Sequence, residues 1–111
     1  MLPKSKRLNT SLFGNIIKKG QPFHGQFLII KTVKTSTLSR FAISVSKNVS
    51  KHAVTRNKIK RRIYSIIKKL ESRIFDGFNV IITVKKGIDK VSYKDLQFDI
   101  EKTFVKSCLL K

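Results

Sequence analysis

The residues best suited to chemistry in this 111-residue chain are basic side chains gathered in one short segment. Five of the seven residues from Arg56 to Arg62 are lysine or arginine, and no acid lies among them. Arginine grips phosphate through a planar set of donors, lysine adds a compact charge, and Asn57 can both donate and accept hydrogen bonds. These residue types in this pattern indicate binding of a phosphate-rich partner.

The charge of the whole chain is as uneven as that segment. The formal net charge is +19, yet all six acids lie at or after Glu71, so residues 1–70 carry +17 and residues 71–111 carry 8 − 6 = +2. Self-repulsion on this scale destabilises a compact state and is relieved by a polyanion. Nucleic acid is favoured over an anionic membrane surface. No apolar run approaches the roughly 18 residues of a membrane span, so no membrane-spanning helix is expected and a membrane is not the expected partner.

The remaining polar residues do not suggest an active site of the protein's own. Two histidines, one cysteine and six scattered acids give no metal-ligand spacing, no nucleophile beside a base and no glycine-rich phosphate loop. Asp99 and Glu101 would point about 200° apart on a helix, which argues against a carboxylate pair. We therefore expect no catalytic residue and no metal ligand in the protein.

A helix is needed to position the basic segment, and its pattern is readable from residue 54 to residue 70. The apolar residues form a stripe about 100° wide that would dock on a sheet: Ile59, Ile63, Ile66, Ile67 and Leu70. One flank of the stripe carries Arg56, Asn57, Lys60, Arg61, Tyr64 and Lys68, and the other carries Lys58, Arg62 and Lys69. Basic side chains at a helix N-terminus destabilise the helix in the free protein. They stabilise it when phosphates bind there.

The other predicted elements complete a small α+β fold. Capping signals predict a first helix after Asn9 that ends near Gly20, and a last helix that begins after Ser92. Residues 26–34 and 40–46 are predicted as neighbouring antiparallel strands, and the unbroken apolar run 78–84 as a central strand. Residues 1–111 are thus predicted to form one domain, a two-layer α/β sandwich of order α-β-β-α-β-α, with room for an extra short strand.

The segment SVSKNVSKHAVTRNKIKRR resembles the signature of the bacterial ribonuclease P protein component. The family pattern is a strand ending in Val-Ser-Lys, a basic loop, and then Ala-Val-x-Arg-Asn-x-x-Lys-Arg. It matches Val45, Ser46, Lys47, Ala53, Val54, Arg56, Asn57, Lys60 and Arg61. LPKSKRL at the start, Phe13 ahead of KKG, and SYKDL before the final helix extend the likeness over nearly the whole chain.

The resemblance implies a function and a set of partners. The chain would be the protein subunit of a cytoplasmic ribonucleoprotein that removes the 5′ leader of precursor tRNA. A catalytic RNA would perform the hydrolysis, with Mg²⁺ bound mainly by that RNA. The protein would be a monomer in a 1:1 complex with the RNA. The family fold further implies a left-handed crossover through the basic helix.

The chemistry of the basic segment and the resemblance together give the site residues. Contacts to the catalytic RNA fall on Lys47, Lys51, His52, Arg56, Asn57, Lys60, Arg61, Tyr64 and Lys68, and Tyr64 stands where the family usually has another arginine. The cleft for the leader falls on Phe13, Ile17, Phe27 and Ile30, of which the two isoleucines stand where aromatics often occur. Phe13 and Phe27 have a second interpretation as ordinary core aromatics, and His52 as a solvated loop residue.

Two other functions remain open on the sequence. A basic ribosomal or RNA-chaperone protein has a similar composition without belonging to an enzyme. The second is a basic peripheral membrane protein or an organellar-import segment. The strand and capping signals favour a folded domain over this second function.

Overall fold

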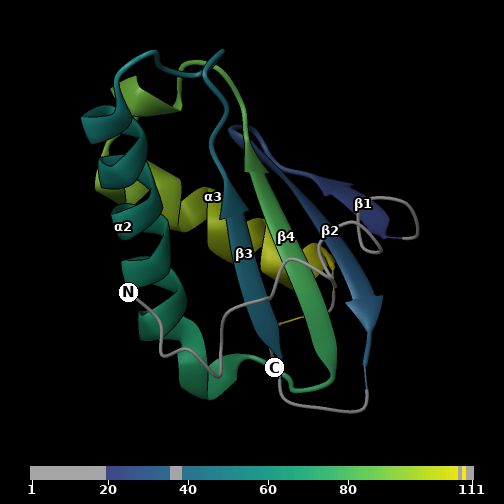
Figure 1. Cartoon of the computed structure of the whole chain (residues 1–111). Coiled ribbons are helices and arrows are strands. Elements are labelled where there is room, and N and C mark those ends of the chain that lie inside the picture. Colours follow the sequence, from purple (N-terminus) through teal and green to yellow (C-terminus); the bar gives the residue numbers. More distant parts are fainter. Residues whose placement is uncertain (1–19, 36–38, 108, 110–111) are drawn as a thin grey trace.

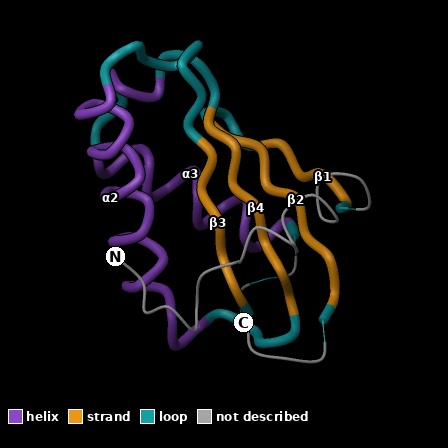
Figure 2. The backbone as a smooth tube through the Cα atoms, viewed as in Figure 1, coloured by secondary structure: helices purple, strands orange, loops and turns teal. Residues whose placement is uncertain are grey.

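The computed structural model describes residues 20–35, 39–107 and 109. The predicted first helix, which includes Phe13 and Ile17, lies outside them. The described elements are the strands β1 (Gln21–His24), β2 (Leu28–Lys34), β3 (Arg40–Ser44) and β4 (Phe78–Val84), the helices α2 (Ala53–Leu70) and α3 (Tyr93–Lys106), and the short 3-10 helices η2 (Glu71–Arg73) and η3 (Ile88–Lys90). The helices and the sheet form two layers, and both helices lie on one side of the sheet (Figure 2).

The four strands form one sheet in the order β1-β2-β4-β3. β4 is central, as its apolar run predicts, and pairs antiparallel with β2 and parallel with β3. The prediction that β2 and β3 are neighbours is wrong, because β4 lies between them. The extra short strand is β1, an edge strand that contains Pro22. Proline is tolerated there because an edge strand leaves one side unpaired.

The connection from β3 through α2 to β4 is a left-handed crossover. In Figure 1, β3 and β4 both point upward, β4 lies to the right of β3, and the helical layer lies behind the sheet. Nearly all parallel crossovers take the opposite hand. The crossover has a direct consequence for the basic segment, since it places α2 beside β3 at one margin of the molecule.

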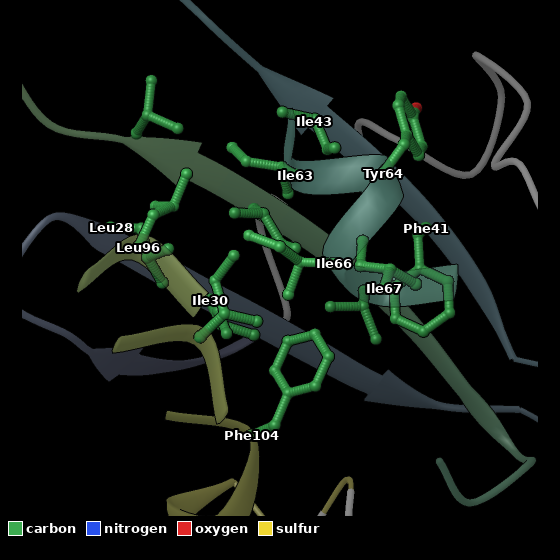
Figure 3. Packing of buried hydrophobic residues seen from close by; sticks show 14 of the residues in the cluster. Leu28, Ile30, Phe41, Ile43, Ile63, Tyr64, Ile66, Ile67, Leu96 and Phe104 are labelled. Carbon is green, nitrogen blue, oxygen red and sulfur yellow. The ribbon is translucent and has the colours of Figure 1, made fainter. Parts of the chain in front are cut away.

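The core fills the space between the helices and one face of the sheet (Figure 3). Cross-strand register builds it in rows: Val80 pairs with Thr32 and Phe41, Ile82 with Ile30 and Ile43, and Val84 with Leu28. The ring of Phe104 stacks on that of Phe41, with centroids 6.3 Å apart. Ile81 points to the opposite face and is also buried, so β4 is covered on both faces as predicted.

Local signals set the ends of the helices. The hydroxyl of Ser92 accepts a hydrogen bond of 3.2 Å from the backbone N–H of Asp95, which confirms the predicted N-cap of α3. α2 ends at Leu70, where the sequence pattern ends, and passes into η2. Gly77 has a φ of 95°, and its carbonyl accepts a hydrogen bond from the N–H of Thr35. This glycine therefore serves a tight turn into β4 rather than the end of α2.

The turn between β1 and β2 is fastened to α3 by one buried carboxylate. The two oxygens of Asp99 accept hydrogen bonds from the backbone N–H groups of Gln26 and Phe27, each at 2.9 Å. Gly25 lies so close that a Cβ atom there would stand 2.6 Å from Oγ1 of Thr103 and 2.9 Å from Asp99. The close approach of backbone to helix is what requires glycine at this position.

Candidate nucleic-acid interface

α2 turns its apolar stripe to the core and leaves its basic residues on the surface. Every residue of the predicted stripe, from Ile59 to Leu70, is buried. Seven of the 18 residues of α2 are lysine or arginine, none is an acid, and each basic residue is at least partly exposed. The helix is therefore amphipathic, with an apolar face toward the core and a positively charged face toward solvent.

Four of the predicted RNA contacts form one hollow on this helix. Asn57, Lys60, Arg61 and Tyr64 line a concavity of about 320 Å³. They occupy positions i, i+3, i+4 and i+7, which share one face of a helix. Tyr64 is only 8% exposed and lies at the edge of the core in Figure 3, so it forms the floor while the two basic residues and the amide form the walls.

The N-terminus of α2 is built without the usual acidic or capping side chains. His52 occupies the N-cap position, its side chain makes no capping hydrogen bond, and the first turn contains no acid. Nη1 of Arg56 donates to the carbonyl of Ser50 at 2.9 Å, while the N–H of His52 donates to Oγ of Ser50 at 3.2 Å. Arg56 thus braces the preceding loop, which the sequence did not predict, and its other guanidinium donors remain for a phosphate.

The other predicted contacts extend the surface at both ends of α2. Lys47, Lys51 and His52 are exposed in the loop between β3 and α2, where the N–H of Val49 donates to the carbonyl of Ser46. Lys68 is exposed near the far end of the helix. Twelve residues separate it from Arg56, or about 18 Å at 1.5 Å per residue. The surface therefore runs the length of the helix.

The second basic flank of α2 is engaged by α3. Nζ of Lys69 lies 4.6 Å from the ring centre of Tyr93, and the hydroxyls of Ser65 and Tyr93 are 3.0 Å apart. Partial burial favours the neutral phenol, but the hydrogen bonds with Ser65 and Lys69 and the charge of Lys69 together lower the pKa of Tyr93 below 10.0. This flank is thus partly occupied by a contact within the protein.

The lowered pKa of Tyr93 gives a direct test of this helix contact. In the variant Tyr64→Phe, Tyr93 is the only tyrosine, and we expect its ultraviolet titration midpoint to fall below 10.0. Adding Lys69→Met is expected to raise the midpoint. The phenolate is favoured in the folded state, so its contribution to stability is present above the unfolded pKa and is lost as the pH falls through the folded pKa. A titration midpoint of Tyr93 that does not change with Lys69→Met would contradict the contact between Lys69 and Tyr93.

The described structure includes only two of the four residues predicted for a leader cleft, Ile30 and Phe27. Ile30 is completely buried between the sheet and the helices. Its assignment to an accessible cleft is therefore withdrawn, because its alternation along β2 turns it to the core. Phe27 is half-buried and packs against the edge of the core. Phe13 and Ile17 lie outside the described residues.

The exposure of two apolar residues was not predicted from the sequence. Val54, in the first turn of α2, is 76% exposed, and Phe98, in the middle of α3, is 69% exposed. Both look like ordinary members of apolar patterns in one dimension. Only the packing shows that they face outward, Val54 beside the basic surface and Phe98 beside the β1–β2 turn.

Neither a metal cluster nor a membrane helix occurs in the part of the chain that the structure describes. No three histidine, cysteine, aspartate or glutamate side chains of residues 20–35, 39–107 and 109 are grouped as metal ligands. Within the same residues, no helix combines the length and apolar character needed to cross a bilayer. The site to be explained is therefore the basic surface on α2.

Comparison with known proteins identifies the family to which the chain belongs. The model of the ribonuclease P family matches residues 2–108. The ribonuclease P protein component of Pseudanabaena sp. (strain PCC 6903) is 35% identical, covering 99% of this chain and 97% of the relative. That of Syntrophomonas wolfei is 31% identical, with 89% and 84% covered.

Solved structures agree with this assignment. The RNase P protein of Staphylococcus aureus superposes with a TM-score of 0.87 at 26% identity, covering 97% of this chain and all of that one. The Thermotoga maritima protein shares the fold, with a TM-score of 0.78 at 22% identity, covering 86% and 92%. The match along nearly the whole sequence, together with the basic helix and the four-stranded sheet, shows that the chain belongs to the ribonuclease P protein family.

Proposed function

We propose that the chain binds the catalytic RNA of ribonuclease P through α2 and thereby supports removal of the 5′ leader from precursor tRNA. One observation carries the proposal: α2 is acid-free, and the predicted contacts Asn57, Lys60, Arg61 and Tyr64 meet in one hollow. Family membership makes the chain a component of ribonuclease P with an RNA partner. The finer assignments to residues rest on the chemistry of the surface.

The proposed contact is made mainly to phosphates. Arg61 and Arg56 bind phosphate oxygens with several donors, Lys60 adds charge, and Asn57 reaches phosphate or ribose. Tyr64, in place of an arginine, offers a hydroxyl and a ring edge instead of a charge. The uncapped N-terminus of α2 adds backbone donors to the same surface. RNA binding relieves the self-repulsion that the free helix carries.

Catalysis in this proposal belongs to the RNA. The protein supplies no residue to the reacting atoms, and Mg²⁺ held mainly by the RNA would supply electrostatic stabilisation for the hydrolysis. The protein acts as a monomer in a 1:1 complex in the cytoplasm. By the resemblance to the family, Phe13, Ile17 and Phe27 are proposed to contact the leader, because aromatic groups stack on unpaired bases and apolar groups pack against them.

A reconstitution tests the proposal. The purified chain is mixed with a bacterial ribonuclease P RNA and precursor tRNA at low magnesium, where RNA alone folds and binds poorly because its phosphates repel one another. We expect faster 5′ maturation with the protein and no cleavage by the protein alone. Product ends are read at nucleotide resolution to establish cleavage at the mature 5′ end.

The same experiment separates the alternatives. A basic ribosomal or chaperone protein would bind the RNA but would not raise the rate of correct cleavage with any bacterial catalytic RNA. A membrane-associated protein would float with anionic vesicles in the absence of nucleic acid and in moderate salt, where surface attraction is screened. Either result would overturn the proposed function.

A further inference from the structure

A second hollow lies away from the basic surface of α2, between the β1–β2 turn and α3. Its volume is about 370 Å³, and residues from both elements line it, among them His24, Phe27, Asp95, Phe98, Lys102 and Lys106. Ligand pockets in proteins range from about 300 to 1,000 Å³. The hollow is therefore large enough for one small unit and too small for a helix or a duplex.

The position of the Phe98 ring in this hollow is not explained by packing of the core. Leu96, Ile100 and Phe104 form the buried stripe of α3, whereas Phe98 is 69% exposed and makes no part of the core. Phe27 is half-buried at the edge of the core and lines the same hollow. An exposed ring costs free energy in water. A ring in a walled hollow recovers that cost by stacking on a flat ligand.

The wall that holds Phe27 is rigidly built. Asp99 is only 6% exposed, and its carboxylate fixes the N–H groups of Gln26 and Phe27. On the other side of the turn, Lys85 donates through Nζ to the carbonyl of Gly25 and through its N–H to the carbonyl of Phe27. The turn is thus held from α3 and from the end of β4, and the hollow is preformed.

The charges at the rim select the ligand. Lys102 and Lys106 are exposed on α3 beside the hollow, and Nζ of Lys106 lies 3.4 Å from the carbonyl of His24. Asp95 is the exposed acid of the lining, whereas the carboxylate of Asp99 is already occupied by the turn. Aromatic rings beside lysines are the usual features of single-strand binding surfaces, where bases stack and phosphates are neutralised. Duplex RNA conceals its base faces and gains nothing from the rings.

We propose that this hollow binds one unpaired nucleotide of RNA, with the base stacked on Phe98 and the phosphate near Lys102. The inference rests on the proposed function only in taking RNA as the partner. The nucleotide belongs either to the leader of precursor tRNA or to an unpaired segment of the catalytic RNA. Both sources present the same chemistry, and the experiment below distinguishes them.

The test compares two exposed apolar residues of α3. Phe98→Ala removes the ring in the hollow, and Val105→Ala removes a side chain that is 58% exposed and does not line it. Neither residue is in the core, so both variants are expected to fold. The probe is a short single-stranded oligoribonucleotide in moderate salt, which weakens purely ionic binding. We expect Phe98→Ala to bind about 5- to 100-fold more weakly and Val105→Ala to bind as the parent does.

Two lysine variants and a duplex RNA probe complete the test. Lys102→Ala is expected to reduce the slope of log K against log salt by about 0.7, the value for one contact to a single strand. Lys94→Ala, an exposed lysine of α3 outside the hollow, serves as the matched control. Duplex RNA is expected to bind equally to the parent and to Phe98→Ala. Unchanged single-strand affinity in Phe98→Ala, or an equal loss for duplex, overturns the proposal.

Binding in the assembled complex then locates the nucleotide. If Phe98→Ala weakens binding of precursor tRNA and not of mature tRNA, the leader occupies the hollow. If Phe98→Ala weakens only the assembly of the protein with the catalytic RNA, the nucleotide in the hollow belongs to that RNA. A chain that fails to stimulate maturation but still loses oligoribonucleotide affinity in Phe98→Ala would overturn the proposed function while supporting this site.

Discussion

Replacing Arg61 by alanine is expected to weaken binding of the catalytic RNA of ribonuclease P by about 10- to 100-fold, as loss of a charge-assisted contact worth about 1.5–3 kcal/mol does. Arg61 is exposed and lines the hollow with Asn57, Lys60 and Tyr64, so the substitution removes a ligand contact and little packing. The slope of log K against log salt should fall by about one unit. Filter binding or fluorescence titration over a range of salt measures both quantities.

Arg73→Ala is the matched control for this experiment. Arg73 is exposed in η2, beyond the last turn of α2, and carries the same guanidinium group and the same charge. A general effect of net charge would weaken both variants alike, whereas a local contact weakens only Arg61→Ala. An unchanged salt slope in Arg61→Ala would remove this residue from the interface, and equal losses in both variants would mean that binding is not localised to the hollow.

Much of the fold is predictable because its strongest signals are local. The apolar residues of α2 form one stripe wide enough to dock on the sheet, so the orientation of the helix follows from the 3.6-residue period. The cap at Ser92 and the unbroken apolar run of β4 are equally local. Each of these predictions is confirmed at residue level.

Strand adjacency and the depth of single residues could not be predicted in the same way. β2 and β3 are consecutive in the chain, and consecutive strands usually pair, but the crossover through α2 returns β4 between them. The same arrangement explains the burial of Ile30. Because Ile30 pairs with Ile82, its side chain faces the helices and is completely buried. Neither result is written in the composition or spacing of β2 itself.

The candidate site divides along the same line. Asn57, Lys60, Arg61 and Tyr64 were grouped correctly because a single helix determines their relative positions. The contact from Arg56 to Ser50 depends on the path of a loop, and the hollow at Phe98 depends on a turn 71 residues away along the chain from that ring. Contacts between residues far apart in the chain therefore cannot be predicted from a helical wheel.

The largest stability effect at a polar residue is expected for Asp99→Ala. The substitution leaves the backbone N–H groups of Gln26 and Phe27 without their acceptor. Hydrogen bonds to charged groups contribute about 1.5–3 kcal/mol each, and unsatisfied buried donors add a desolvation cost. We expect a loss of about 3–5 kcal/mol in the free energy of unfolding, measured by urea denaturation of the free protein.

Asp95→Ala removes the same charge from the same helix and is the control, because Asp95 is exposed and its backbone N–H, which the cap uses, is retained. Its loss is expected to stay below about 1 kcal/mol, the size of a charge effect at a helix N-terminus. Asp99→Asn separates charge from geometry: its amide oxygen can accept from one backbone N–H, while its NH₂ group opposes the other. An intermediate loss in Asp99→Asn would show that both oxygens hold the turn. A loss in Asp99→Ala no larger than that in Asp95→Ala would mean that the β1–β2 turn keeps its position without the carboxylate, and that the hollow beside Phe98 is supported chiefly by Lys85 and the core.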